Sequence, residues 1–121
     1  MYLDSAATLQ KSRYVIDGVK SYLENDYANI HRGRYELSEH SESMFRSSRK
    51  KCAELINAND EAELVFTANA TDASNKLVHS LCLSGMLQAG DKVLLSSAEH
   101  HANIIPWMMA AERYGIDIQF I

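Results

Sequence analysis

Three short stretches of the sequence gather side chains that could do chemistry. Residues 31–34 bring one imidazole and two guanidinium groups together, and planar guanidinium forks suit carboxylates and phosphates. Residues 99–103 contain the adjacent pair His100 and His101, which could bind a metal, transfer protons or stack on a flat cofactor. Residues 67–75 carry Asn69 and Thr71, two polar side chains beside a predicted helix start, where backbone N–H groups attract anions.

Each stretch also has a purely structural interpretation. Thr71 or Asp72 could simply cap the helix that follows. The histidine pair could form a capping loop, and adjacent side chains point apart, which makes them a poor chelate. The arginines of residues 31–34 could belong to a solvated surface loop, because most arginines lie at the surface. Residue types alone leave all three alternatives open.

The first half of the chain predicts helices. Apolar residues recur at steps of three and four after Ser12, a favoured helix-capping residue, so we expect a helix from there to about residues 24–27. Ser38 is a possible N-cap of a second helix. The loop between them contains His31 and Arg32. We assign residues 1–57 to an N-terminal arm and helical segment.

The second half predicts alternating strands and helices. Residues 63–67, 92–96 and 116–121 are predicted as strands. A helix ending near Gly85 separates the first two, and a helix ended by Gly115, with Pro106 near its first turn, separates the last two. This βαβαβ order is typical of a parallel sheet, so the fold class is α/β. Residues 58–121 would form this incomplete domain. In it, the candidate functional turns at residues 67–75 and 99–103 would each follow the end of a strand.

Composition narrows the function classes. The chain has 121 residues, 46% of them hydrophobic, and a net charge of −4, which suits a globular domain and disfavours nucleic acid as a partner. It contains no apolar run long enough to span a membrane and no basic secretory leader. Two separated cysteines make neither a disulfide framework nor a zinc motif. We therefore expect a cytoplasmic protein without a metal site.

Three segments together resemble the pyridoxal-phosphate-dependent cysteine desulfurases of the class V aminotransferase family, in the branch shared with selenocysteine lyases. These segments are residues 3–7 (LDSAA), 27–33 (YANIHRG) and 99–107 (EHHANIIPW). Glu63-Leu64-Val65-Phe66 and Ala89-Gly90-Asp91 fit the same family. The resemblance covers nearly the whole chain. It implies that the predicted sheet is part of the large domain of a fold-type I transferase.

The resemblance also implies roles for individual residues. His100 matches the histidine that stacks on the pyridine ring of pyridoxal 5′-phosphate and transfers protons. Thr71 matches a threonine that helps to hold the cofactor phosphate, and Ala70 lies beside it in the same cofactor-binding turn. The substrate-binding residues implied by the family are Ala6, Ala7, His31 and Arg32, the last two in a loop near a dimer interface.

For a complete family enzyme, the implied reaction removes sulfur from L-cysteine through a cofactor aldimine. It leaves a persulfide on the protein, releases L-alanine and passes sulfur to iron–sulfur assembly proteins. The implied assembly is a homodimer. Four functional residues of such enzymes would lie beyond Ile121: the Schiff-base lysine, the aspartate paired with the pyridine nitrogen, the nucleophilic cysteine and the carboxylate-binding arginine. We therefore expect this chain to be inactive alone.

Some residues depart from the family pattern, and other functions stay open. Asn69-Ala70-Thr71-Asp72 replaces a common Gly-Thr-Thr-Glu run, so one hydroxyl is missing, and Ser12-Arg13 replaces a common Lys-Pro pair. The sequence does not distinguish L-cysteine from L-selenocysteine as substrate. A non-catalytic binding or dimerisation module of the same fold is an alternative. So is a metal-binding protein that uses four histidines, namely His31, His40, His100 and His101.

Overall fold

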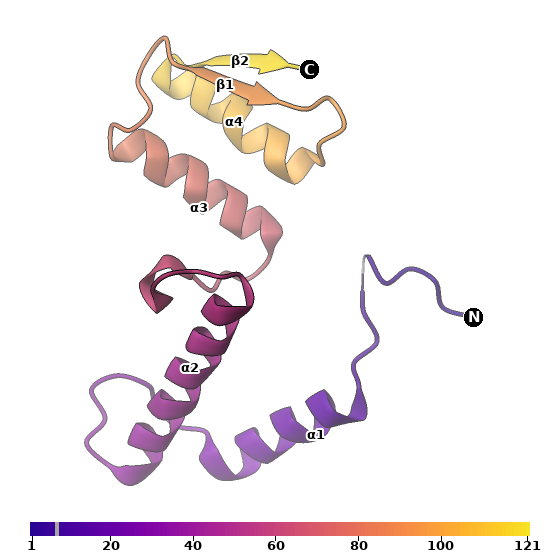
Figure 1. Ribbon diagram of the computed structural model, residues 1–121, viewed down its shortest axis with the longest axis vertical. Helices are drawn as coiled ribbons and strands as arrows, with labels where there is room; N and C mark the ends of the chain where they lie inside the picture. Colours follow the sequence, from indigo (N-terminus) through magenta and orange to yellow (C-terminus); the bar gives the residue numbers. More distant parts are fainter. Residues whose placement is uncertain (7) are drawn as a thin grey trace. The chain divides into compact units, whose positions relative to one another are not determined.

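The computed structural model describes residues 1–6 and 8–121 (Figure 1). The chain forms two compact units, Met1–Leu64 and Val65–Ile121, and each is considered by itself. The predicted division into domains 1–57 and 58–121 stays a prediction, because compactness alone does not test it. No helix among the described residues combines the length and the apolar character needed to cross a bilayer.

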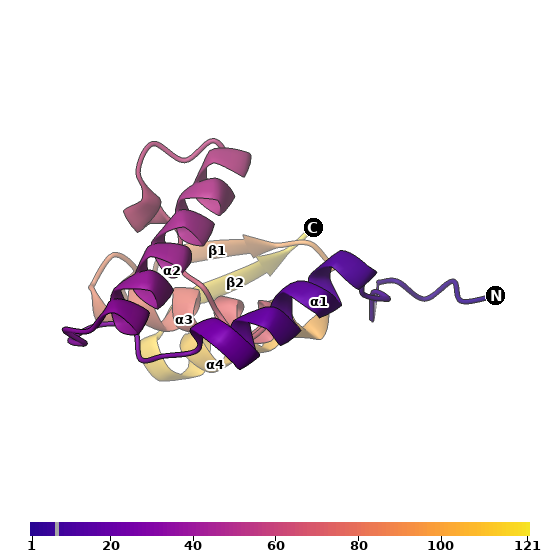
Figure 2. The same ribbon diagram turned by 90° about the horizontal axis from the view of Figure 1, so that it is seen from below.

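The first unit is built from helices. α1 (Arg13–Ser21) continues into the π-helical turn η1 (Tyr22–Asp26), so the two form one helical segment (Figure 2). Ser12 caps α1 as predicted, because its hydroxyl accepts a hydrogen bond from the Val15 amide at 3.4 Å. A loop over residues 27–35 leads into α2 (Glu36–Leu55). The short 3₁₀ helix η2 (Glu61–Glu63) follows.

The N-terminus of α2 differs from the prediction. The helix begins at Glu36, with Tyr35 as its N-cap residue, so Ser38 lies inside the first turn and does not cap it. Ser38 is buried, with 1% of its surface exposed, and its hydroxyl donates to the Asn29 carbonyl oxygen at 2.6 Å. The Ser38 hydroxyl, which the sequence pattern assigned to capping the helix, thus donates to a loop carbonyl instead.

The second unit is an α/β arrangement. α3 (Ala70–Leu83) precedes β1 (Lys92–Leu95), which is followed by α4 (His101–Tyr114) and β2 (Asp117–Phe120). The two strands are parallel, with Lys92 opposite Asp117 and Leu95 opposite Phe120. Figure 1 shows both arrows pointing the same way, α4 next to the sheet and α3 against α4. The predicted parallel pairing of these two strands is confirmed.

An apolar core holds this second unit together. Its six buried members come from both helices, from β1 and from the residue before β2: Val78, Cys82, Leu95, Trp107, Ala110 and Ile116. Burial of side chains this large is the main favourable term in folding. Gly115 ends α4 in the left-handed region at φ 71°, a conformation in which glycine is the least strained residue. The predicted stop at Gly115 is therefore confirmed.

Two predictions about the second half are wrong. The described part of the chain forms a two-stranded sheet, and residues 63–67 are not a strand. They leave η2 and run in an irregular segment in which Val65 is 70% exposed. Pro106 is the sixth residue of α4 and so lies beyond its first turn. Because proline has no backbone N–H, it cannot donate to the carbonyl four residues earlier.

Candidate functional site

The candidate site lies at one end of the second unit, where both of its helices begin. β1 ends at Leu95, and residues 96–100 lead directly into α4. α3 starts at the same end, on the side of α4 that faces away from the sheet (Figure 1). The Ser97 amide donates to the Ile121 carbonyl oxygen at 2.8 Å, which ties the loop after β1 to the end of β2. Ligands in open α/β sheets bind at this edge.

His100 is the N-cap of α4. Its Nδ1 accepts a hydrogen bond from the Ala102 amide at 3.1 Å, and its carbonyl oxygen accepts one from the Asn103 amide at 2.8 Å. An accepting Nδ1 carries no proton, so in the neutral ring the hydrogen resides on Nε2. The side chain is exposed. The capping interpretation of this loop is therefore confirmed, and it leaves the ring face and Nε2 available to a ligand.

His101 is the neighbour of that cap and the first residue of α4. Its ring centroid lies 6.3 Å from that of His100, and the two ring planes are tilted by 54°. Within residues 1–6 and 8–121, no group of three or more His, Cys, Asp or Glu side chains is placed to hold a metal ion. His100 and His101 are thus not part of such a group in their own unit.

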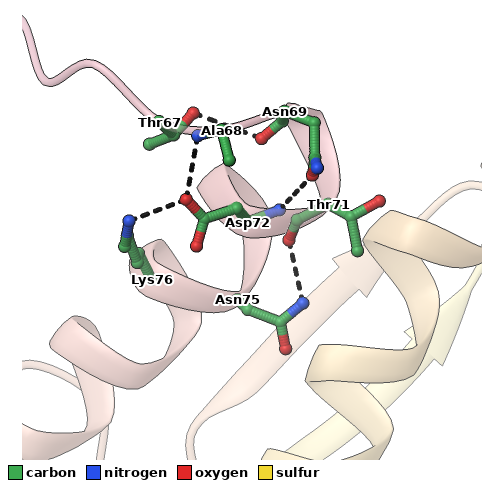
Figure 3. A network of polar contacts seen from close by, with 7 residues as sticks. All are labelled: Thr67, Ala68, Asn69, Thr71, Asp72, Asn75 and Lys76. Atoms are coloured by element: carbon green, nitrogen blue, oxygen red, sulfur yellow. Dashed lines mark hydrogen bonds and ion pairs between the residues drawn. The ribbon is translucent and has the colours of Figure 1, made fainter.

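A polar network surrounds the start of α3 (Figure 3). Asn69, and not Thr71 or Asp72, is the N-cap: its Oδ1 accepts from the Asp72 amide at 2.9 Å. The Asp72 carboxylate in turn accepts from the Ala68 amide at 3.1 Å and from Lys76 Nζ at 2.7 Å. These two partners, the Lys76 ammonium first, hold the pKa of Asp72 below its ordinary value. Asp72 is thereby kept as a paired carboxylate.

Thr71 lies beside this network without joining it through its hydroxyl. Its carbonyl oxygen accepts from Asn75 Nδ2 at 2.8 Å. Figure 3 shows the Thr71 hydroxyl turned away from the pair formed by Asp72 and Lys76. The side chain is exposed, and the amides of Ala70 and Thr71 have no acceptor within the helix because they belong to its first turn. A hydroxyl and two N–H donors are therefore available to an anion here.

The remaining predicted site residues belong to the first unit. His31 and Arg32 are exposed and stand together in the loop before α2. Both have left-handed backbones, with φ of 68° and 62°. The His31 and Phe45 rings form a T-shaped pair at a centroid distance of 6.4 Å. Ala6 is exposed, and Ala7 lies outside the described residues. The structure thus groups Ala70, Thr71 and His100 at one end of the second unit, and His31 with Arg32 in the first.

Sequence reasoning missed the structural roles of two groups of residues that organise these sites. Asn69 has the right chemistry for an N-cap, and its position three residues before Asp72 is the spacing at which an N-cap side chain accepts from a helix amide. Ser38 and Ser41 are both buried on α2. Their spacing of three places them on one helix face, which was the available signal.

Comparisons with known proteins agree on one family. The aminotransferase class-V family model matches residues 1–121. A probable cysteine desulfurase from Synechocystis is 41% identical over 121 residues, covering all of this chain and 29% of that protein. The chain therefore spans about 29% of the length of this curated relative.

Solved structures give the same result for the fold. The apo structure of a cysteine desulfurase from Thermococcus onnurineus matches the whole chain with a TM-score of 0.90 and 32% identity, covering 30% of that protein. The cysteine desulfurase CsdA from Escherichia coli matches 98% of the chain with a TM-score of 0.78 and 33% identity, again covering 30% of that protein. Matched along its entire length by the family model, this chain belongs to the class V aminotransferase family.

Proposed function

We propose that this chain is the N-terminal portion of a cysteine desulfurase that uses pyridoxal 5′-phosphate and converts L-cysteine to L-alanine with transfer of sulfur to the protein. The observation that carries this is the placement of the His100 ring and the Thr71 hydroxyl at the starts of two helices at one end of the same unit. The relatives and solved structures named cysteine desulfurase support it.

The residues at the helix starts fit the two ends of this cofactor. The Thr71 hydroxyl and the first-turn amides of α3 supply donors for a phosphate, and the helix dipole adds favourable potential there. Ala70 adds an amide but no hydroxyl. Asp72 does not oppose an anion at full strength, because its charge is paired with Lys76 at 2.7 Å. The cofactor, when bound, supplies an electron sink for the substrate's α-carbon.

His100 would act through its free side. With Nδ1 used by the Ala102 amide, Nε2 is the atom that can hold or move a proton, and the exposed ring face can pack against a flat heterocycle. The cap fixes the ring before any ligand arrives, and such preorganisation favours catalysis. Thr71 and His100 would therefore bind and orient, and His100 would also transfer protons.

The wider roles complete the proposal. Ala6, Ala7, His31 and Arg32 would contribute to substrate binding. The active form would be a homodimer that hands sulfur to iron–sulfur assembly proteins. The protein would reside in the cytoplasm. L-selenocysteine is the alternative substrate, and comparing its turnover with that of L-cysteine separates a lyase from a desulfurase.

The sharpest experiment replaces the matched segment of the Escherichia coli enzyme CsdA by this chain and measures alanine released from L-cysteine. We expect an active chimera in which His100→Asn lowers kcat by about 10²-fold or more. Asparagine is a strong N-cap, so this variant keeps the helix start and removes only the imidazole. An active chimera whose kcat is unchanged by His100→Asn would contradict the role of His100, and His101→Ala is the matched control.

A further inference from the structure

The two most completely buried side chains among the described residues are serines. Ser38 and Ser41 are each 1% exposed, and both lie on α2. Burying a hydroxyl is unfavourable unless it is hydrogen-bonded. Each donates to a carbonyl oxygen of the preceding segment, Ser38 to Asn29 at 2.6 Å and Ser41 to Asp26. The buried face of this part of α2 therefore hydrogen-bonds to backbone carbonyls of the segment that precedes the helix.

The segment that these serines hold is strained. His31 and Arg32 are consecutive non-glycine residues with φ of 68° and 62°, and this left-handed region is unfavourable for residues with a Cβ. Such conformations persist only when surrounding contacts enforce them, and they concentrate at functional sites. Both side chains are exposed, so burial of these side chains does not account for the strained backbone.

Gly33 joins the strained pair to Ser38. A Cβ built at Gly33 would come within 1.8 Å of Ser38 Oγ and 2.4 Å of Ser38 Cβ. Hence residue 33 must lack a side chain for Ser38 to occupy its place. The His31 and Phe45 rings form a T-shaped pair, with 82° between the ring planes. Ser38, Ser41 and Phe45 follow at steps of three and four, so they share one face of α2.

We propose that Ser38 is a positioning residue that fixes the loop Asn29–Gly33 so that the His31 imidazole and the Arg32 guanidinium are oriented before a ligand arrives. That this ligand is the amino-acid substrate rests on the proposed function. Preset donors lose less entropy on binding than mobile ones. One helical turn further along, Ser41 holds Asp26, the last residue of η1, from which the chain enters this loop.

The test uses the isotopically labelled 121-residue chain and compares Ser38→Ala with Ser48→Ala by NMR. Ser48 is the matched control, because its hydroxyl donates at 2.8 Å to Met44 of its own helix and holds no loop. We expect Ser38→Ala to abolish the cross-peak between the His31 and Phe45 rings. We also expect the amide order parameters of His31 and Arg32 to fall from about 0.85 to below about 0.6.

Chemical shifts along α2 separate positioning from a general loss of structure. In the supporting result, the loop signals change in Ser38→Ala while those of α2 stay helical, and Ser48→Ala alters neither. A rigid loop with its cross-peak intact in Ser38→Ala overturns the proposal. If Ser38→Ala melts α2, Ser41→Ala replaces it, and melting in both variants also overturns the proposal.

These measurements need neither cofactor nor substrate, so they are independent of the enzymatic proposal. A rigid, serine-dependent loop in a chain whose chimera shows no desulfurase activity would refute the proposed function and leave Ser38 as a positioning residue. An active chimera, together with a loop whose signals are unchanged by Ser38→Ala, would support the proposed function and refute the positioning role of Ser38.

Discussion

The two units of this chain are stabilised by different kinds of contact. In Val65–Ile121, six buried apolar or thiol side chains from α3, α4, β1 and the residue before β2 pack into one cluster. In the described part of Met1–Leu64, the buried residues are Ala53, Ser38 and Ser41. One unit excludes water with large side chains, whereas the other relies on directional hydrogen bonds from hydroxyl to carbonyl.

The difference extends to the exposed surface of the first unit. α1 has no buried residue, and its apolar side chains are about half exposed, with Val15 and Ile16 at 46% and Val19 at 54%. Substitutions should therefore act through different mechanisms in the two units. In the second unit, the largest losses of stability should come from substitutions that remove buried side-chain volume. In the first unit, they should come from substitutions that disturb hydrogen-bond geometry.

The largest effect is expected at Trp107. It is 9% exposed within the core cluster, so Trp107→Ala should lower the free energy of unfolding of the second unit by about 3–5 kcal/mol. Urea unfolding followed by methyl NMR of that unit measures this. Met108→Ala is the control, since Met108 is 51% exposed. Equal losses in the two variants would show that the cluster is not the source of stability.

A medium effect is expected at Gly33 in the first unit. A methyl group there would collide with Ser38 Oγ, so Gly33→Ala should destabilise the unit by about 1–3 kcal/mol through overpacking. Gly18→Ala is the matched control, because a Cβ on Gly18 meets nothing within 4 Å and the residue lies inside α1. That control should stabilise the unit by about 0.5–1 kcal/mol. Thermal unfolding curves with the same sign for both variants would contradict the prediction.

The smallest effect is expected at the exposed start of α3. The pKa of Asp72 is lowered from 3.8 by Lys76 and the Ala68 amide. A lowered folded-state pKa gives stability that is fully present above the unfolded-state value and is lost as the pH falls below 3.8 through the folded-state value. Titrating the Asp72 carboxyl by ¹³C NMR should give a midpoint below 3.8.

Lys76→Met sharpens this prediction, because it removes the first cause of the shift and keeps the chain length. The midpoint of Asp72 should then move up towards 3.8. An unchanged midpoint would assign the shift to the Ala68 amide. The energetic effect of an exposed pair is small, since solvent screens it.

Local signals in the sequence predicted much of the fold. Ser12 caps α1, Gly115 ends α4, and β1 and β2 pair in parallel as expected. Capping and chain reversal depend on a few neighbouring residues, so sequence patterns detect them. The family resemblance, supported by the match over residues 1–121, added the family assignment, which periodicity alone could not give.

Features that depend on distant partners were predicted less well. The run at residues 63–67 has strand-forming residues, but a strand needs a neighbour to complete its hydrogen bonds, and propensity says nothing about that neighbour. Ser38 has the chemistry of a helix cap, yet it donates to Asn29, nine residues earlier. The sequence thus identified the chemistry of Ser38 but not its partner.

The candidate site divides in the same way. The residue types at positions 71 and 100 left capping and ligand binding open, and the family resemblance implied the cofactor roles. The structure places both residues at helix starts. The sequence left open whether His100 caps a helix or takes part in catalysis. The geometry allows both roles, because Nδ1 caps α4 and the second imidazole nitrogen can serve a different purpose.

The close packing of Gly33 and Ser38 has a consequence for how homologous sequences diverge. Because one position has no side chain and the other fills the vacated space, neither can enlarge on its own. Across related proteins the two positions should covary in size, with any bulkier residue at 33 accompanied by glycine at 38. Drift at this pair is thus restricted to coordinated exchanges, however freely the neighbouring exposed positions change.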